Sequence, residues 1–325
     1  MGLTHRVFRA AAEIPEGFGP SVAVIGNFDG VHLGHQELLR AAIAEARARN
    51  ARAVAITFDP HPDRFLRPEE APGLLTLIPE RLRLLEATGV DAVVVLPFDE
   101  ALASLSAREF VVEILHDRLG VLALHEGRNF RFGHRAEAGA SELAAFGQEF
   151  GFGLTIHPPV ETHHLEISSS AIRALVARGR VERARWMLGR PFGVVSTQAR
   201  GRGIGTRLLV PTVNLAPYAG LLPAFGVYVT RLTVGVGAGR RVFEAITNVG
   251  ERPTFGAASF AVESHILDFE PVEMTAETSL RLEFMRRQRG EIEWPSPEAL
   301  KAQIGKDVAR ARRWWRLARR IFSGK

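Results

Sequence analysis

The hydrophobic pattern of the first half of the chain alternates between short continuous apolar runs and longer stretches of helical spacing. Ser21–Gly26 is an apolar run that ends in glycine, which predicts a buried strand, and Gln36–Asn50 has apolar residues at helical spacing. The alternation continues to about residue 185, with further strands expected at 53–58, 91–96 and 121–124 and further helices at 79–88 and 107–119. Strands and helices that alternate in this way predict an α/β fold, with a parallel sheet covered by helices on both faces.

The pattern changes after Gly189, where helical spacing fades and short β-rich runs appear between glycines and prolines. These runs cover residues 226–234, 242–248, 261–269 and 280–284. Several strands at close spacing with turn signals predict an antiparallel β-barrel. The pattern therefore indicates two domains: residues 1–186 with a Rossmann-like α/β fold, and residues 187–325 with the barrel and a terminal helix.

The last segment, Ser296–Phe322, returns to helical spacing. Ser296 is a good N-terminal cap, and Pro297 suits the first helical turn. Residues 309–322 read ARARRWWRLARRIF, an amphipathic pattern with arginines on the polar face. We expect the apolar stripe to pack on the barrel; binding to a membrane surface or to nucleic acid is the alternative.

Composition restricts the kinds of site that the chain can build. Of its 325 residues 46% are hydrophobic, enough to fill two cores, and no stretch approaches the roughly 20 apolar residues of a membrane span. The chain has no cysteine, so disulfides and thiolate metal sites are excluded. We therefore expect a cytoplasmic protein. The net charge of +5 comes almost entirely from arginine, which suits anionic ligands such as nucleotides; an arginine-rich genomic composition is the other explanation.

The turn between the first expected strand and the first expected helix carries the clearest candidate chemistry. It reads IGNFDGVHLGHQELL from Ile25 to Leu39 and contains three glycines, Gly26, Gly30 and Gly34. Ligands bind at the carboxyl ends of the strands of an open parallel sheet, and a helix N-terminus there favours phosphate. The turn therefore predicts a nucleotide-binding site.

Two histidines in this turn, His32 and His35, are three positions apart and so share one helical face. An imidazole can donate hydrogen bonds to phosphoryl oxygens, so both are candidate phosphate-binding groups. A zinc site would need a third ligand, for which His61 is the nearby candidate. Zinc binding and a simple helix cap without a ligand remain open on the pattern alone.

A second polar segment, Glu166–Arg173, places three hydroxyl groups at the start of an expected helix and an arginine one turn later. The hydroxyls are those of Ser168, Ser169 and Ser170. Serines at this position can simply cap the helix. Together with Arg173 they can also form a phosphate clamp of hydroxyl donors, backbone donors and one fixed cation. The two segments together favour the phosphate-binding interpretation.

The segments GNFDGVHLGH (26–35) and ISSSAIR (167–173) resemble the two signatures of the nucleotidyltransferase superfamily. More narrowly, they resemble the adenylyltransferase half of bacterial bifunctional riboflavin kinase/FAD synthetases, as do FDPHP (58–62) and NFRFG (129–133). The chain has Asn129 where many relatives have aspartate, and Ser170 where threonine is usual. The resemblance implies catalytic roles for His32 and His35. It also implies ATP binding by Gly26, Asn27, Phe28, Asp29, Gly30, Gly34, Ser168, Ser169, Ser170 and Arg173, and flavin-side contacts by Phe58, Pro60, Asn129 and Arg131.

The second half lacks the G-x-x-x-x-G-K-[ST] motif, so a Walker-type ATP site is excluded. It has instead two glycines, Gly203 and Gly205, shortly before Thr212 and Asn214, and glycines let a backbone approach a polyphosphate. Thr212 and Asn214 lie on the same side of an extended segment, where their oxygens could bind magnesium beside phosphate. Glu263 stands in a largely apolar run and is either a general base for a hydroxyl nucleophile or an ordinary outward residue of a strand.

These segments resemble the riboflavin kinase domain, whose signature is P-T-x-N followed by V-E-x-H-x-L-D-F. The resemblance implies that Thr212 and Asn214 bind Mg²⁺ and the ATP phosphates, and that Glu263 deprotonates the ribityl hydroxyl. The chain departs from the family at Leu209, where a glycine is common, and at residues 271–276, where an L-Y-G triplet is common.

The resemblance covers nearly the whole chain and implies a bifunctional enzyme with Mg²⁺ as cofactor. The barrel would phosphorylate riboflavin with ATP to FMN, and the N-terminal nucleotidyltransferase domain would adenylylate FMN with a second ATP to FAD and pyrophosphate. The departures keep open an alternative, an FAD synthetase whose altered barrel only binds flavin. A further alternative is an arginine-rich nucleic-acid-binding protein. We expect small-molecule substrates and no nucleic acid or membrane partner; a weak homo-oligomer is left open.

Overall fold

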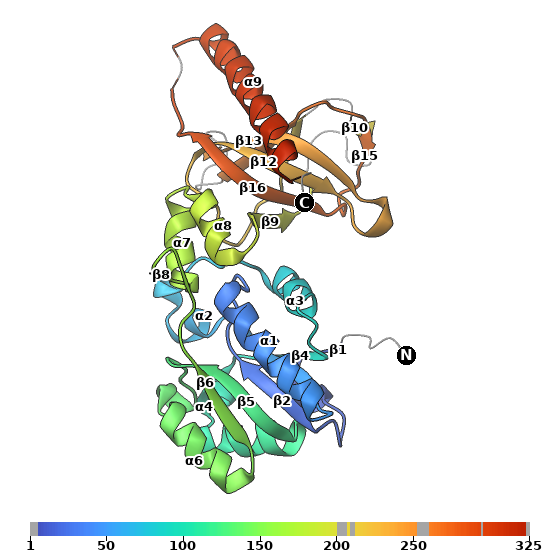
Figure 1. Cartoon of the computed structure of the whole chain (residues 1–325). Helices are drawn as coiled ribbons and strands as arrows, with labels where there is room; N and C mark the ends of the chain where they lie inside the picture. Colours follow the sequence, from blue (N-terminus) through green and yellow to red (C-terminus); the bar gives the residue numbers. More distant parts are fainter. Residues whose placement is uncertain (1–5, 200–206, 209–211, 252–259, 294, 323–325) are drawn as a thin grey trace. The chain divides into compact units, whose positions relative to one another are not determined.

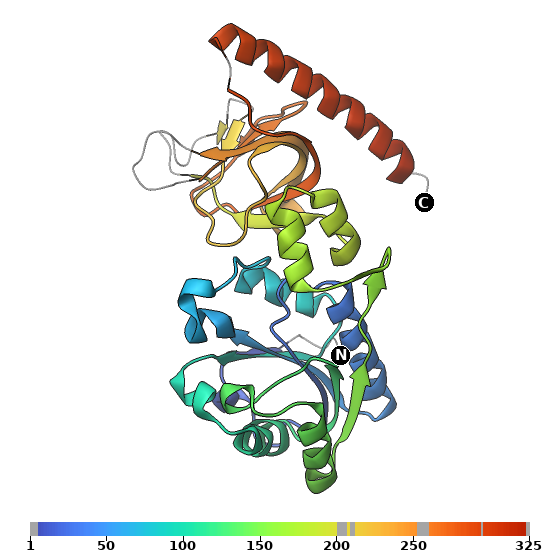
Figure 2. The same cartoon turned by 90° about the vertical axis from the view of Figure 1, so that its left-hand side faces the viewer.

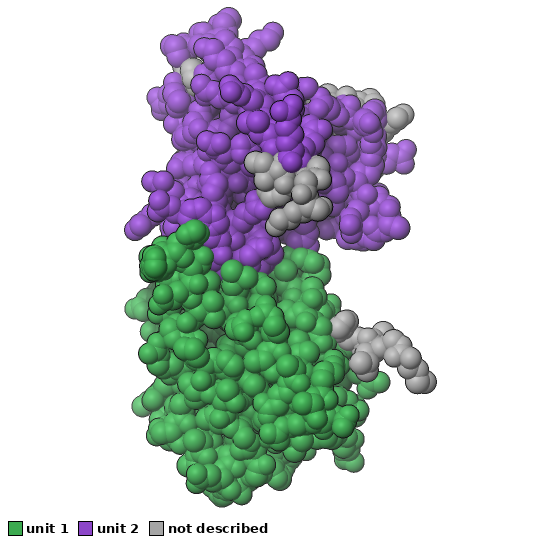
Figure 3. All heavy atoms as spheres, viewed as in Figure 1, with its two compact units in different colours: residues 1–169 green, residues 170–325 purple. Residues whose placement is uncertain are grey.

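The computed structural model describes residues 6–199, 207–208, 212–251, 260–293 and 295–322. The chain forms two compact units, residues 1–169 and 170–325 (Figure 3). The division falls in helix α7 (Ser169–Ala177), upstream of the boundary expected at 186/187, because α7 and the next helix, α8 (Val181–Leu188), group with the barrel. Within the second unit, Arg287 of the barrel donates from Nη1 to the carbonyl of Arg178, directly after α7. The boundary at 186/187 stays a prediction.

The first unit is built on a parallel sheet of six described strands, ordered β1-β4-β3-β2-β5-β6 (Figure 1). The strands are β1 (Arg6–Phe8), β2 (Ser21–Ile25), β3 (Arg52–Asp59), β4 (Ala92–Pro97), β5 (Val121–Gly127) and β6 (Gly153–His157). The strands expected at 21–26, 53–58, 91–96 and 121–124 are confirmed as β2 to β5. The pattern does not predict β1 or β6, because β1 has three residues and β6 is mostly exposed, so neither shows a continuous buried run.

Helices cover both faces of this sheet, as the pattern predicts. The longer ones are α1 (Leu33–Ala48), α3 (Ile78–Glu86), the π-helical η3 (Phe110–Arg118) and α6 (Ala140–Phe150), and the shorter ones are η1 (Ala11–Glu13), α2 (Pro62–Leu66), η2 (Pro68–Glu70), α4 (Glu100–Ser104), α5 (Ala107–Glu109) and η4 (His134–Ala136). A small hairpin, β7 (Glu161–Thr162) and β8 (Leu165–Glu166), precedes α7. The helix expected at 107–119 is the short α5 continued by the π-helical η3.

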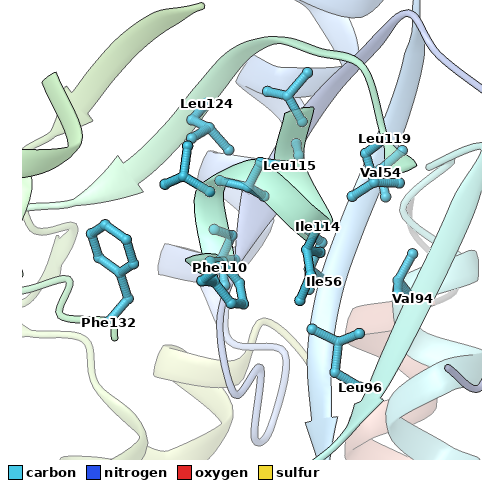
Figure 4. Packing of buried hydrophobic residues seen from close by; sticks show 14 of the residues in the cluster. Val54, Ile56, Val94, Leu96, Phe110, Ile114, Leu115, Leu119, Leu124 and Phe132 are labelled. Carbon is cyan, nitrogen blue, oxygen red and sulfur yellow. The ribbon is translucent and has the colours of Figure 1, made fainter. Parts of the chain in front are cut away.

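Successive side chains of the strands enter two separate cores. On one face, Val22 and Val24 of β2 pack in a cluster with Leu39 of α1. On the other face, Ile56 of β3 packs in a cluster with Ile114 of η3 (Figure 4). Because both faces of the sheet are covered, consecutive strand positions are apolar, and the strands read as continuous apolar runs in the sequence.

The second unit contains an antiparallel sheet of six described strands, ordered β11-β14-β13-β12-β16-β9. The strands are β9 (Phe192–Ser196), β11 (Thr212–Asn214), β12 (Gly226–Val234), β13 (Arg241–Glu251), β14 (Phe260–Ile266) and β16 (Leu280–Arg289); η5 (Gly237–Gly239) lies between β12 and β13, and β10 (Arg207–Leu208) pairs with β15 (Val272–Glu273). The two edges of the sheet meet where Gln198 pairs with Leu215, and the Ala199 N–H donates to the Asn214 carbonyl at 2.8 Å. These bonds close the sheet, which confirms the antiparallel barrel.

The terminal helix α9 (Pro297–Phe322) packs on the barrel (Figure 2). The Ser296 hydroxyl accepts from the Ala299 N–H at 3.2 Å, which confirms Ser296 as the cap. Trp315 of α9 is buried in one cluster with Val229 of β12 and Ile246 of β13. The apolar stripe of the helix therefore packs on the barrel, as the sequence predicts.

Candidate active sites

A cavity of about 510 Å³ lies in the first unit, at the carboxyl ends of β2, β5 and β6 and beside the start of α1. Many of the residues expected to bind ATP or flavin line it: Gly26, Phe28, His32, Gly34, His35, Asn129, Ser168 and Ser169. The two motif segments meet there, because the Ser169 hydroxyl donates to the Asp29 carbonyl at 2.8 Å across 140 positions of sequence. The structure thus brings the segments at 26–35 and 167–169 to one site.

The turn between β2 and α1 has an unusual backbone. Phe28 and Val31 have positive φ angles of 47° and 38°, and Gly30 has 85°. This left-handed backbone is ordinary for glycine but costs about 1–2 kcal/mol for residues with a Cβ. Phe28 keeps it because its ring is 1% exposed and packs edge-on against His35, with 5.2 Å between ring centroids. Strain of this kind is typical of loops that position a ligand.

Asp29 and Gly30 hold a neighbouring loop. The fully buried Asp29 carboxylate accepts from the N–H groups of Leu75 (3.0 Å) and Thr76 (2.9 Å) and from the Thr76 hydroxyl. The Gly30 N–H donates to the oxygen of that hydroxyl at 2.9 Å. Asn27, Asp29 and Gly30 are outside the lining of the cavity as the structure describes it. These residues therefore support the turn, and their direct contact with ATP stays a prediction.

His32 and His35 form a stacked pair at the start of α1. Their ring centroids are 3.6 Å apart, with 17° between the ring planes. His32 is the N-cap residue, and its Nδ1 accepts from the His35 N–H at 3.3 Å. Because Nδ1 accepts, a neutral His32 ring carries its proton on Nε2, which is then a donor suited to a phosphate oxygen. Capping the helix and binding phosphate are thus compatible roles for His32.

Gly34 leaves space for the His32 ring beside the start of α1, because glycine has no side chain. A Cβ at position 34 would lie 3.2 Å from both Nδ1 and Cε1 of that ring. The first-turn N–H groups of a helix lack intrahelical partners, and the helix dipole adds partial positive charge at the same end. Glycine at this position therefore lets a histidine ring and a helix N-terminus share one site for an anion.

Glu126 is a site residue that the sequence interpretation missed. It lies at the end of β5, lines the cavity, is 1% exposed, and accepts from the Ile25 N–H at 2.8 Å. Burial raises the pKa of this carboxyl well above its ordinary value, against the opposing effect of that hydrogen bond. A glutamate inside the apolar run VLALHEG is the signal that could have identified it. Burial therefore favours the neutral form of the carboxyl beside the cavity.

Three expected flavin-side residues are outside the lining of the cavity as described. Phe58 in β3 packs edge-on against Phe98, with 5.8 Å between centroids, and Pro60 directly follows that strand. Arg131 donates from Nε and Nη2 to the Ala136 carbonyl, at 3.0 and 2.7 Å, and so shapes the loop after β5. Their contact with flavin stays a prediction.

Ser170 and Arg173 belong to the second unit. Helix α7 places Arg173 one turn after Ser169, on the same helical face. Their role at the phosphates therefore rests on the sequence, and it stays a prediction.

The structure gives His61 a local role. Its Nδ1 accepts from the Asp63 N–H at 3.2 Å, which caps α2. Over the described ranges of the chain, no group of three or more His, Cys, Asp or Glu side chains could hold a metal ion. The zinc alternative for His32 and His35 therefore gains no support from the geometry.

In the second unit, strand register brings the kinase-motif residues together. Asn214 of β11 lies directly opposite Glu263 of β14, which in turn lies opposite Asn248 of β13. Residues directly opposite share a sheet face, with Cβ atoms roughly 4.5–5.5 Å apart. Thr212 lies on the same face, opposite His265. Thr212, Asn214 and Glu263 therefore share one polar face of the barrel.

The other face of these strands is the buried interior of the barrel. A chain of buried hydroxyls crosses it, with 2.6 Å from Thr230 to Thr247 and 2.8 Å from Thr247 to Ser264. Glu263 is exposed on the outer face. The Asn214 Oδ1 atom is buried and has no hydrogen-bond partner among the described residues.

Part of the predicted kinase site lies outside the described residues. This holds for Gly203 and Gly205 and for Leu209, the position of one departure from the family pattern. In the segment of the other departure, Val272 and Glu273 form β15, which pairs with β10.

Comparisons with known proteins match both halves of the chain. The FAD synthetase family model matches residues 15–171, and the riboflavin kinase family model matches residues 188–315. A bifunctional riboflavin kinase/FMN adenylyltransferase of Escherichia coli (strain K12) is 33% identical over 92% of this chain and 94% of its own length. Its counterpart from Pseudomonas fluorescens is 36% identical, over 90% of this chain and 92% of its own.

A solved structure also resembles the chain. It is described as a macrolide-efflux protein from Streptococcus pneumoniae and is 30% identical, with a TM-score of 0.79 over 96% of this chain and 99% of that one. In the part of the present chain that the structure describes, no helix is long and apolar enough to cross a membrane.

Proposed function

The chain belongs to the bifunctional riboflavin kinase/FMN adenylyltransferase family, and from this premise we propose how its residues divide the two reactions. The protein phosphorylates riboflavin with ATP to FMN, and it adenylylates FMN with ATP to FAD. The proposed residue roles rest above all on the one cavity where the two adenylyltransferase motifs converge. We keep residues 1–186 and 187–325 as the proposed domain limits.

In the adenylyltransferase domain, a phosphate oxygen of FMN attacks the α-phosphorus of ATP, and pyrophosphate leaves. This reaction needs no covalent intermediate, so the protein contributes alignment and stabilisation of charge. His32 and His35 donate to phosphoryl oxygens, and the N–H groups at the start of α1 do the same. Ser168 adds a hydroxyl donor, while Ser169, whose hydroxyl donates to the Asp29 carbonyl, holds its segment beside the turn. Burial raises the pKa of Glu126, which favours the neutral carboxyl and weakens its repulsion of the phosphates.

The kinase reaction takes place on the polar face of the barrel. Glu263 is exposed and lies between its cross-strand partners Asn214 and Asn248. It accepts the proton of the ribityl hydroxyl as that oxygen attacks the γ-phosphorus of ATP. Its exposure supports this role, because an exposed carboxylate is accessible to the substrate hydroxyl.

Mg²⁺ is the cofactor that we propose for the kinase site. The fit rests on Asn214, whose buried Oδ1 lacks a partner among the residues described and is an oxygen ligand of the kind that Mg²⁺ takes. Thr212 lies two positions earlier on the same face and supplies a second oxygen. When bound, Mg²⁺ neutralises part of the negative charge of the phosphates.

We propose small-molecule substrates alone, without nucleic acid or membrane partners, and a cytoplasmic location. The arginines of α9 support this view, since part of their charge is used within the barrel domain. Arg312 pairs with Asp268, and Arg319 pairs with Glu244 at 3.0 Å.

The activity is tested by incubating the purified protein with riboflavin and Mg-ATP and separating riboflavin, FMN and FAD over time. We expect FMN to appear first and FAD to follow. Conversion of supplied FMN to FAD without any conversion of riboflavin would support the alternative, in which the barrel only binds flavin. The Asn214–Glu263 register and the family match over residues 188–315 argue against that alternative.

A further inference from the structure

A chain of three titratable side chains runs from the surface of α1 to the cavity of the adenylyltransferase domain. The Glu45 carboxylate of α1 contacts His125 Nε2 of β5 at 2.7 Å, and His125 Nδ1 contacts His157 Nε2 of β6 at 2.9 Å. His125 is 4% exposed, and His157 lines the cavity. At the outer end, Glu45 also pairs with Arg49 at 2.8 Å. The proposed reaction uses none of these groups.

The order of partners determines which nitrogens carry protons. An ionised Glu45 accepts, so Nε2 of His125 donates, and a neutral His125 then accepts at Nδ1. His157 must therefore donate from Nε2, which leaves a lone pair on its Nδ1. Burial lowers the pKa of His157, which favours its neutral ring. In this state His157 presents a hydrogen-bond acceptor at Nδ1.

The strand register leaves room beside His157. Its direct partner on β5 is Gly127, which has no side chain, and a Cβ built at Gly127 would meet no atom within 4 Å. His125 lies two positions earlier on the same face of β5, and from there its ring contacts His157. The open space beside His157 therefore belongs to the cavity that His32 and His35 also line.

We propose that His157 Nδ1 accepts a hydrogen bond from an amino or hydroxyl group of ATP, and that His125 and Glu45 are positioning residues that hold His157 in this accepting tautomer. The inference rests on the proposed adenylyltransferase function of the cavity. ATP is the assigned ligand because the same cavity contains the His32–His35 pair at the start of α1, where its phosphates bind in the proposed reaction. ATP has both kinds of donor, the adenine amino group and the ribose hydroxyls.

The first test compares steady-state kinetics of FMN adenylylation in His157 variants. For His157→Phe we expect the KM for ATP to rise about threefold to tenfold, the equivalent of one ordinary hydrogen bond, while the KM for FMN stays unchanged. His157→Asn, which places an acceptor oxygen near the Nδ1 position, should recover most of this loss. His116→Phe, an exposed histidine on η3, is the matched control and should change neither constant. Riboflavin phosphorylation by the same samples reports whether each variant is intact.

The positioning role makes a separate prediction about coupling. His125→Phe alone should raise the KM for ATP, but combining it with His157→Phe should cause no further rise, because both changes remove one interaction. Glu45→Gln replaces an acceptor-only carboxylate with an amide that can accept or donate, so it fixes the tautomer less firmly and should give a smaller rise. In ¹⁵N spectra of the wild-type imidazoles near neutral pH, His157 should show a protonated Nε2 and a bare Nδ1.

ATP analogues identify the partner group. A 6-oxopurine nucleotide lacks the amino donor, and the 2′-deoxy and 3′-deoxy analogues each lack one hydroxyl. For the analogue without the partner group, wild type and His157→Phe should have the same KM. If every analogue preserves the difference between them, the hydrogen bond to ATP is refuted.

An unchanged KM for ATP in His157→Phe, in a preparation that still forms FAD, would overturn this proposal and leave the enzyme's function standing. A protonated Nδ1 on His157 would likewise overturn it. Failure of the wild type to convert FMN to FAD is a different result, and it would contradict the proposed function itself.

Discussion

Gly34→Ala tests the proposed catalytic role of His32 separately from the stability of α1. The new Cβ would lie 3.2 Å from Nδ1 and Cε1 of His32, so the ring must yield by a few tenths of an ångström. Alanine is favoured over glycine within a helix by about 0.5–1 kcal/mol. The free energy of unfolding should therefore stay equal to that of the wild type or rise slightly, even though the ring has moved.

The cost to catalysis follows from the same displacement. A misplacement of about 1 Å in a catalytic site can cost about 100-fold in rate, so a shift of a few tenths should cost roughly threefold to tenfold. The assay measures kcat for FMN adenylylation and for riboflavin phosphorylation on one preparation, together with urea unfolding. We expect adenylylation to fall and riboflavin phosphorylation to stay unchanged.

Gly305→Ala provides the matched control. Gly305 lies inside α9, and a Cβ there would meet no atom within 4 Å, so only the helix preference changes. This variant should be slightly more stable and keep both activities. Full adenylylation by Gly34→Ala would refute the argument that the position of the His32 ring matters. An equal loss of both activities would show a general defect instead.

Three further variants test the proposed roles. His32→Ala combined with His35→Ala should abolish FAD formation from FMN while riboflavin phosphorylation persists; loss of both activities in a folded protein would defeat the two-site assignment. Glu263→Gln should lower kcat for riboflavin phosphorylation by about 100-fold or more while adenylylation continues, and undiminished kinase turnover would remove Glu263 as the base. Burial raises the pKa of Glu126 in the folded protein above the ordinary glutamate pKa of about 4.3. Its contribution to stability is therefore fully present below the ordinary pKa, and it is lost as the pH rises through the raised pKa. Glu126→Gln should therefore be no more stable than the wild type at acid pH and gain relative to it at higher pH; urea unfolding across the pH range checks this, and a pH-independent difference would contradict it.

The central strands of the first unit could be predicted from the sequence because burial on both faces produces continuous apolar runs. β6 gave no such run, since its residues are mostly exposed or half-buried, and β11 is three residues long. The N-terminal cap of α9 could also be predicted, because Ser296 and the residues that it caps are adjacent in sequence. The sequence therefore identified the strands with a repeated pattern of burial and the helix whose cap is adjacent to it in the sequence.

The sequence pointed to those candidate site residues that belong to a motif. It did not point to residues whose hydrogen-bond partners are distant in the sequence. His157 gains its role from His125, which is 32 positions away, and from Glu45, which is 80 positions from His125. No spacing rule joins three residues on α1, β5 and β6. Asp29 shows what a motif leaves out: its carboxylate accepts from the backbone and hydroxyl groups of Leu75 and Thr76, while its contact with ATP stays a prediction.

The hydrogen bond from Ser169 to Asp29 also determines when the proposed ATP site can form during synthesis. The two residues are 140 positions apart, which corresponds to roughly 7–28 s of translation at about 5–20 residues per second. Until Ser169 emerges, the nascent sheet can form and its glycine turn can fold, but one wall of the cavity is missing. A chain released before that point would have most of an adenylyltransferase fold and an open cavity. Premature termination near residue 168 should therefore yield a protein that folds in part and makes no FAD.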